Sequence, residues 1–96
     1  MKSLSSEDGW RNFLKLCGQL KTAKQFNDFF DLFLTAEERK DIGNRCDVIN
    51  ALLKNNESQR DIAARLGISI AKISRGSNYL KIISKDLRKF LKSQLI

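Results

Sequence analysis

Apolar residues recur every three or four positions along most of the chain, the spacing that places side chains on one face of a helix. The first such segment starts near Ser5 or Ser6 and runs to about residue 24. Its apolar stripe consists of Trp10, Phe13, Leu14, Cys17 and Leu20. A short second segment over residues 25–34 continues the pattern with Phe26, Phe29, Phe30 and Phe33. Both segments predict amphipathic helices.

Four further helices are predicted from their start and stop signals. Thr35 and Glu38 match a capping box that begins the third helix. Lys54-Asn-Asn ends this helix, because Asn tolerates the left-handed conformation. Its apolar stripe is Ile42, Cys46, Ile49, and Leu52 or Leu53. The remaining helices are expected from Ser58 to Gly67, from Ser69 to about Leu80 and from Ser84 onward.

The scarcity of helix breakers supports an all-α fold. The chain has no Pro and only five Gly, so helices with short connections are expected. Its 96 residues allow one small domain, which buries only about two-thirds of its unfolded surface and gains stability from a partner. No internal repeat and no interdomain linker interrupts the pattern.

The composition excludes several classes of function. The chain has no His, which rules out catalysis by imidazole and the common zinc sites. No acid, base and nucleophile converge, so we expect neither an enzyme nor a metal site. Cys17 and Cys46 form no disulfide framework and are predicted to be core residues. No apolar run approaches the roughly 20 residues of a membrane span, and no signal peptide is expected. These features predict a soluble, cytoplasmic protein.

Charge and aromatic residues separate along the chain. The net charge is +7, from 18 Lys and Arg against 11 Asp and Glu. Residues 1–53 carry eight basic and eight acidic groups, so the whole excess lies in residues 54–96. Six of the eight aromatic residues precede residue 34. The first half is therefore expected to be buried at a subunit interface, or else in a tight monomeric core. The second half is suited to an anionic partner such as nucleic acid.

Residues 59–75 carry the most specific signal. A helix-turn-helix motif requires a small residue where its helices cross, which Ala63 provides, and Gly in the turn, which Gly67 provides. The apolar wedge positions hold Ile62, Leu66, Ile68 and Ile73. These residues predict a DNA-binding hairpin. The alternative is an ordinary helical hairpin within a core, which leaves basic side chains such as Arg65 hard to place.

The second helix of the motif is expected to enter the major groove with its first residues at base edges. These residues are Ser69, Ile70, Ala71 and Lys72, followed one turn later by Ser74. They offer methyl groups to thymine and, through Lys72, a cation to guanine or phosphate. Water bridges and DNA shape are therefore expected to contribute to recognition. Gln59 and Arg60 can reach a phosphate or a guanine edge, and Lys81 can reach a phosphate.

Two strings of residues are more specific than the motif itself. They are Leu34-Thr-Ala-Glu-Glu-Arg39 and Ile73-Ser-Arg-Gly-Ser-Asn-Tyr-Leu-Lys81. Both resemble the bacterial tryptophan repressor family, whose signature is Arg-Gly-Ser-Asn-x-Leu-Lys. Further matches are Trp10, Gly43, Arg45, Leu52-Leu53 and Ser58-Gln-Arg60. The resemblance extends without gaps over residues 32–95, about two-thirds of the chain.

This resemblance implies an intertwined homodimer of six-helix chains with a helix-turn-helix DNA-binding head. Residues 1–57 would form the dimerisation core, residues 58–81 the helix-turn-helix, and residues 82–96 a C-terminal helix that closes the core. Because a two-fold dimer presents two heads about one helical turn of DNA apart, a palindromic operator is implied.

The resemblance also implies L-tryptophan as a corepressor, without any further cofactor. Arg45 and Arg75 would flank the indole ring, since cations favour aromatic faces, and Arg75 would also meet the ligand carboxylate. Gly76 would leave room for the ligand. The partner subunit would supply carbonyl groups and an apolar wall from Leu32, Leu34 and Thr35. Bound ligand would favour the DNA-competent arrangement of the heads.

The function that follows is an L-tryptophan-dependent repressor of tryptophan biosynthesis or uptake genes. Tyr79 departs from the family pattern, which usually has a small residue, often Ser, that helps orient the ligand amino group. The Tyr79 ring could swing aside, offer its hydroxyl from farther away, or fill part of the pocket. A second hypothesis is therefore a DNA-binding regulator of the same fold that is tryptophan-independent or senses a different ligand. A third is a module whose helix-turn-helix binds a partner protein.

Overall fold

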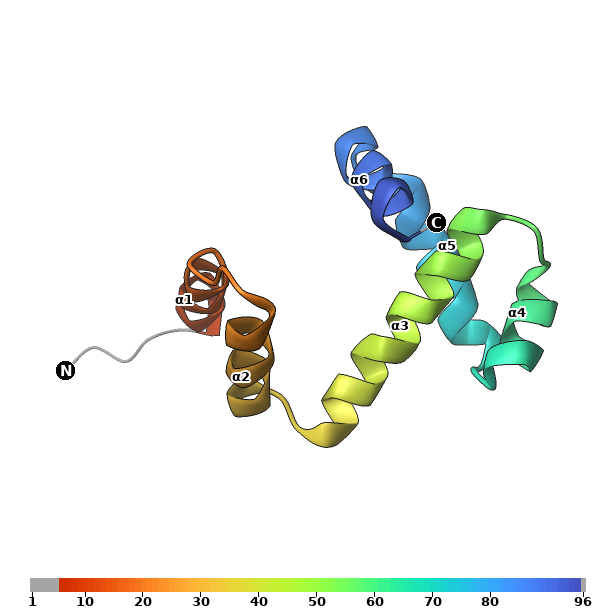
Figure 1. The fold of residues 1–96 in the computed structure, drawn as a ribbon. Helices are drawn as coiled ribbons and strands as arrows, with labels where there is room; N and C mark the ends of the chain where they lie inside the picture. The colour runs from red at the N-terminus through yellow and green to blue at the C-terminus, as the bar shows by residue number, and fades with distance from the viewer. Residues whose placement is uncertain (1–5, 96) are drawn as a thin grey trace. The chain divides into compact units, whose positions relative to one another are not determined.

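The computed structural model describes residues 6–95, which form six α-helices and no strand (Figure 1). The helices are α1 (Ser6–Cys17), α2 (Ala23–Phe33), α3 (Ala36–Lys54), α4 (Gln59–Leu66), α5 (Ile70–Ile82) and α6 (Lys85–Leu95). The all-α prediction is confirmed. Ser5, one of the two residues expected to begin the first helix, lies outside the described residues. No helix within residues 6–95 combines the length and apolar character needed to cross a membrane.

The chain divides into two compact units at Thr35. The first contains α1 and α2, and the second contains α3 to α6. In the first unit, α1 ends at Cys17, and the prediction that it continues to about residue 24 is wrong. The N–H groups of Gln19 and Leu20 donate to carbonyls three residues earlier, at 3.0 and 3.2 Å. These shorter loops tighten the chain at Gly18 and Gln19 and end the helix, so Leu20 lies beyond it.

A capping box begins α2 at Ala23, before the expected start at Gln25. Thr22 Oγ1 accepts a hydrogen bond from the Gln25 N–H at 3.1 Å, and Gln25 Oε1 accepts one from the Thr22 N–H at 3.2 Å. The two residues thus satisfy each other's backbone donors. The same Thr-x-x-Gln spacing is readable in the sequence.

Aromatic side chains hold α1 against α2. The Phe13 ring centroid lies 5.4, 6.4 and 5.3 Å from those of Phe29, Phe30 and Phe33, distances at which aromatic rings attract each other. Trp10 stacks on Phe13 at 5.6 Å yet is 56% exposed. No residue of α2 is buried. The aromatic cluster therefore keeps an open apolar face in the single chain.

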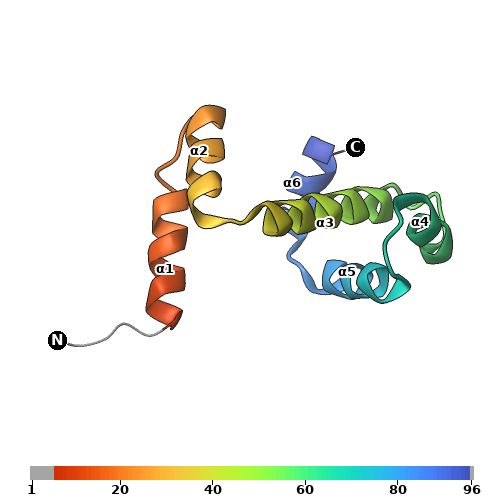
Figure 2. The same ribbon diagram turned by 90° about the horizontal axis from the view of Figure 1, so that it is seen from below.

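The second unit has its core where α4 and α5 pack on the C-terminal part of α3 (Figures 1 and 2). The buried side chains are Val48, Ala51, Ile62, Ala63 and Ile73, against which Leu52, Leu66 and Ile68 also pack. Ile62 and Ile73 are almost completely inaccessible to solvent. The apolar residues expected between the two helices of the hairpin therefore lie there.

Only the C-terminal part of the apolar stripe expected on α3 is covered. Leu53 is buried and Ile49 and Leu52 are half-buried, whereas Ile42 and Cys46 are exposed in the single chain. The reason is that α4 and α5 cover only the C-terminal part of α3. The prediction that both cysteines are core residues is accordingly wrong for Cys46, while Cys17 is half-buried. Val48 and Ala51, which are also buried, were not part of the expected stripe.

The turns on either side of α4 have the expected conformations. Asn55 and Gly67 adopt the left-handed conformation, with φ of 53° and 66°; Gly does so without steric cost because it lacks Cβ. The hydroxyls of Ser58 and Ser69 accept hydrogen bonds from the N–H groups three residues further on, at 3.1 and 3.3 Å. The predicted ends of α4 and the predicted start of α5 are confirmed.

The last helix, α6, begins after Ser84, whose hydroxyl accepts a hydrogen bond from the Leu87 N–H at 3.1 Å. The Arg88 guanidinium donates to the Leu80 carbonyl near the end of α5. No residue of α6 is buried, and Phe90 is 58% exposed. The apolar face of α6 is therefore open in the single chain.

Candidate functional site

The residues predicted to contact DNA lie on α4, on α5 or at its N-cap. They are Gln59, Arg60, Ser69, Ile70, Ala71, Lys72, Ser74 and Lys81. All are exposed except Ser74, which is half-buried. The first turn of α5 contains no acidic residue, so no carboxylate there opposes an anionic partner. Lys81 lies near the other end of α5, about 13 Å along the helix from Lys72.

A hydrogen bond joins the start of α4 to α5. The Ser74 hydroxyl donates to Oε1 of Gln59 at 3.0 Å. The two residues are 15 positions apart, so the packing of the two helices brings them together. Two of the predicted DNA-contacting side chains are therefore in direct contact with each other.

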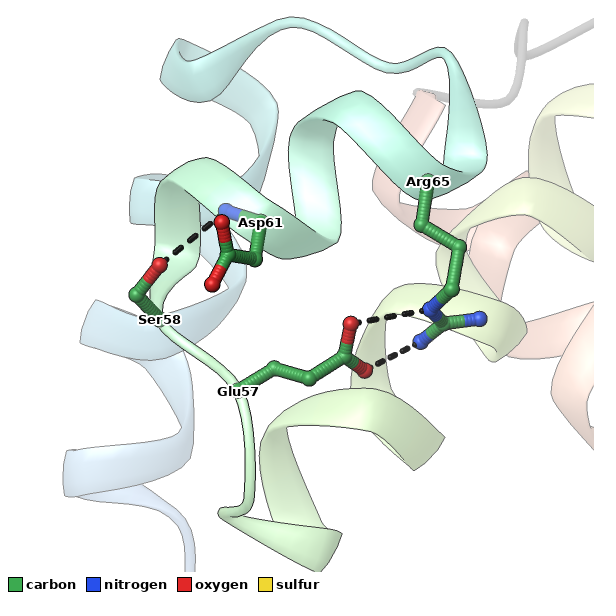
Figure 3. A network of polar contacts seen from close by, with 4 residues as sticks. All are labelled: Glu57, Ser58, Asp61 and Arg65. Carbon is green, nitrogen blue, oxygen red and sulfur yellow. Dashed lines mark hydrogen bonds and ion pairs between the residues drawn. The ribbon is translucent and has the colours of Figure 1, made fainter.

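Arg65 is held by an ion pair within the second unit (Figure 3). Its Nε donates to Glu57 Oε2 at 2.9 Å, and its Nη2 donates to Glu57 Oε1 at 2.6 Å. These hydrogen bonds lower the pKa of Glu57 and raise the pKa of Arg65, because they favour both charged forms. The ion pair connects the loop before α4 to the last turn of α4. Arg65 thus has a structural partner without any DNA.

A hollow of about 370 Å³ opens between α3 and α5. It is lined by Asp41, Asn44, Arg45, Val48 and Ile49 of α3, by Lys72, Arg75, Gly76 and Tyr79 of α5, and by Ile68. Four of the seven residues predicted for the ligand, Arg45, Arg75, Gly76 and Tyr79, therefore line one pocket. Guanidinium groups from two different helices give this pocket the chemistry to hold a flat, anionic molecule.

Gly76 and Tyr79 shape the α5 side of this pocket. A Cβ at Gly76 would lie 3.3 Å from Val48 Cγ1 and 3.4 Å from Leu52 Cδ1, so Gly76 permits close packing of α5 on α3. The Arg75 guanidinium lies over the Tyr79 ring, 5.4 Å from its centroid, which is within cation–π range. Tyr79 is 55% exposed. Its ring thus already contacts one of the two pocket arginines.

The three other residues predicted for the ligand, Leu32, Leu34 and Thr35, belong to the first unit and lie outside this lining. Six lining residues were not predicted as ligand contacts: Asp41, Asn44, Val48, Ile49 and Ile68, and Lys72, which was predicted only for DNA. Three of those on α3 lie three or four positions from Arg45, on the same helix face. This spacing was the signal that could have found them.

Comparisons with known proteins identify the family of the chain. A family model described as Trp repressor protein matches residues 8–95. A Trp operon repressor homolog of Chlamydia caviae is 47% identical over 97% of this chain and 92% of its own length. A homolog of the same description from Chlamydia trachomatis serovar D is 44% identical over 93% of this chain and 95% of its own length. One from Haemophilus influenzae is 34% identical over 90% of this chain and 85% of its own.

The helical fold and these matches define a transcription regulator and not an enzyme. The chain belongs to the Trp repressor family.

Proposed function

We propose that this protein is an L-tryptophan-dependent repressor that binds palindromic operator DNA of tryptophan biosynthesis or uptake genes. The observation that carries the proposal is the pocket between α3 and α5, where Arg45 and Arg75 line the same hollow of about 370 Å³. In the proposal, the indole ring stacks between the two guanidinium groups, and Arg75 also meets the carboxylate.

The α4–α5 hairpin acts as the helix-turn-helix reading head. The buried Ile62, Ala63 and Ile73 and the left-handed Gly67 support this role, because they are the residues that set the packing of two such helices. The exposed first turn of α5 enters the major groove, Gln59 and Arg60 contact a phosphate or a guanine edge, and Lys81 contacts a phosphate.

Open apolar surfaces support a homodimer. Trp10, Leu32, Ile42 and Phe90 are 56%, 80%, 49% and 58% exposed, and burial of such surfaces between subunits is favourable. In the proposal, residues 1–57 form the dimerisation core, residues 58–81 the head, and residues 82–96 the closing helix. Leu32, Leu34 and Thr35 of the partner subunit complete each ligand pocket.

The pocket and the reading surface share α5. Lys72, at the start of α5, lines the hollow and is also a candidate DNA contact. A ligand in the pocket therefore fixes the helix that meets the DNA, and ligand and DNA strengthen each other's binding by the same coupling free energy.

A second candidate function rests on Tyr79. Because its ring contacts Arg75 and lines the pocket, the site could take a ligand other than tryptophan, or none. The protein would then be a DNA-binding regulator of the same fold without tryptophan dependence.

One titration distinguishes the candidates. The protein selects duplexes from a randomised pool, with and without L-tryptophan, and its affinity for the selected duplex is measured in both conditions. We expect tight binding only with L-tryptophan. This binding should weaken as the salt concentration rises, because each chain carries a net charge of +7. Equal binding in both conditions would favour the second candidate. Absence of sequence-selective binding in both would exclude both candidates and favour a protein-interaction module.

A further inference from the structure

The contact between Ser74 and Gln59 lies within the surface proposed for DNA. Gln59 is the first residue of α4 and is exposed, whereas Ser74 lies one turn into α5 and is half-buried. The Ser74 hydroxyl donates to Gln59 Oε1 at 3.0 Å. The half-buried partner therefore fixes the side chain of the exposed one.

The contact orients the carboxamide of Gln59. A Gln side chain has an acceptor oxygen on one side and two N–H donors on the other. Because Oε1 accepts the hydrogen bond from Ser74, the two N–H donors of Nε2 are left to donate to another acceptor. A Gln side chain without this hydrogen bond would lose rotamer entropy on binding an acceptor. In this protein the hydrogen bond to Ser74 already restricts the rotamer of Gln59, so less entropy is lost on binding.

The surroundings favour an anionic acceptor. Gln59 lines a second hollow of about 310 Å³ together with Ser77 and Lys81. Ser74, Ser77 and Lys81 follow one another at spacings of three and four along α5, which places them on one helix face. The one carboxylate in this lining belongs to Glu57, and it is neutralised by Arg65. An amide donor and a cation thus lie at one recess.

We propose that Ser74 contributes to DNA binding through Gln59: its hydroxyl holds the carboxamide so that Nε2 donates to a backbone phosphate. The inference rests on the proposed function and deepens it. Ser74 becomes a positioning residue instead of a direct contact to DNA. Phosphate is the acceptor, because the recess also carries Lys81, and such contacts fix the register of a reading head on the duplex.

A double-mutant cycle tests the proposal on the full chain. The probe is the duplex that the wild-type protein selects with L-tryptophan, and the dissociation constant is measured by fluorescence anisotropy. We expect Ser74→Ala to weaken binding roughly fivefold, the value of one hydrogen bond of about 1 kcal/mol. Gln59→Ala weakens binding at least as much, and adding Ser74→Ala to Gln59→Ala produces no further loss.

Two conservative variants separate positioning from a structural role. Ser74→Thr keeps the hydroxyl and should bind as the wild type does. Gln59→Glu keeps an acceptor for Ser74 but replaces the amide donors by negative charge, so it should bind less tightly than Gln59→Ala. Ser93→Ala on α6 is the matched control and should leave binding unchanged. The denaturation midpoint of each variant, measured in parallel, identifies any loss of folding.

Three results would overturn the inference. An unchanged affinity of Ser74→Ala would show that the hydroxyl is not used. If Ser74→Ala weakens binding by the same factor in the Gln59→Ala background as in the wild type, Ser74 contacts DNA directly. A Ser74→Thr variant as weak as Ser74→Ala would also contradict it. If the wild-type chain selects no duplex with or without L-tryptophan, the proposed function itself fails.

Discussion

Arg65 donates two parallel hydrogen bonds to Glu57, from Nε to Oε2 at 2.9 Å and from Nη2 to Oε1 at 2.6 Å. The pair spans eight residues and connects the loop before α4 to the last turn of this helix. Ser58, the residue after Glu57, caps α4 by accepting a hydrogen bond from the Asp61 N–H (Figure 3). Bidentate pairing of this kind fixes geometry as well as charge, so it holds the first helix of the hairpin at both ends.

The ion pair predicts a pH dependence of stability. The Arg65 hydrogen bonds lower the pKa of Glu57 below its ordinary value of 4.5. The stabilisation is therefore complete above about pH 4.5 and is lost as the pH falls through the lower pKa of the folded state. We expect Glu57→Gln to unfold at lower urea concentration than the wild type at neutral pH, with the difference shrinking below about pH 4.5.

The measurement is urea unfolding followed by circular dichroism between pH 7 and pH 3, at one protein concentration, since oligomerisation shifts apparent stability. Arg65→Met serves as the matched variant, because it removes the partner and keeps most of the side-chain length. It should abolish the effect of Glu57→Gln in the double variant. If the stability difference between wild type and Glu57→Gln stays the same down to pH 3, the Glu57–Arg65 ion pair is not its cause.

A side chain at Gly67 is predicted to destabilise the protein through the backbone conformation alone, without any steric clash. Its φ is +66°, and a Cβ there would meet no atom within 4 Å. Gly67→Ala should therefore cost about 1–2 kcal/mol of unfolding free energy through backbone strain. Gly43→Ala, in the helical backbone of α3 with equally open space, is the control and should stabilise by about 0.4–1 kcal/mol. Equal effects of the two substitutions in chemical denaturation would refute this explanation.

Gly76 is predicted to be constrained by packing instead. It lies within α5, so Ala would gain about 1 kcal/mol of helix propensity. The added Cβ would, however, lie 3.3 Å from Val48 Cγ1, and overpacking costs about 1–3 kcal/mol. We expect Gly76→Ala to be neutral or destabilising. In a Val48→Ala background the same change should be less harmful, and additive effects in this cycle would exclude the contact as the cause.

The sequence predicted the elements whose signals are local. Gly67 and Asn55 ended helices where expected, and Ser58 and Ser69 began them. The predicted end of α1 was wrong because Leu20 continues the apolar stripe of the helix. In the structure the N–H of Leu20 instead bonds to the Cys17 carbonyl and closes a tighter loop. The Thr22–Gln25 capping box was local and readable but was outweighed by that stripe.

The side-chain pairs of the candidate site could not be predicted in the same way. Glu57–Arg65 and Gln59–Ser74 join residues 8 and 15 positions apart, so each depends on how α4 packs on its neighbours. Burial of α3 was misjudged for Cys46 for a similar reason. Apolar periodicity marks a face, but the packing partner decides which part of the face is covered.

Tyr79 provides the sharpest test of the ligand pocket. Its ring contacts the Arg75 guanidinium, the group that would stack on an indole ring, and both line the hollow of about 370 Å³. A ligand must therefore share Arg75 with Tyr79. Tyr79→Ser removes this internal competitor, whose cation–π contact is worth about 0.5–1 kcal/mol at an exposed site. We expect L-tryptophan to bind this variant roughly two- to fivefold more tightly.

Isothermal titration calorimetry with L-tryptophan measures the effect. Tyr79→Phe keeps the ring and should match the wild type, so it separates the ring from the hydroxyl. If Tyr79→Phe instead binds more weakly, the hydroxyl contacts the ligand. Unchanged affinity in Tyr79→Ser would place the ring outside the ligand's space, and weaker binding would mean that the ring supports Arg75 during binding. Either result would remove the reason, drawn from Tyr79, to consider a ligand other than tryptophan.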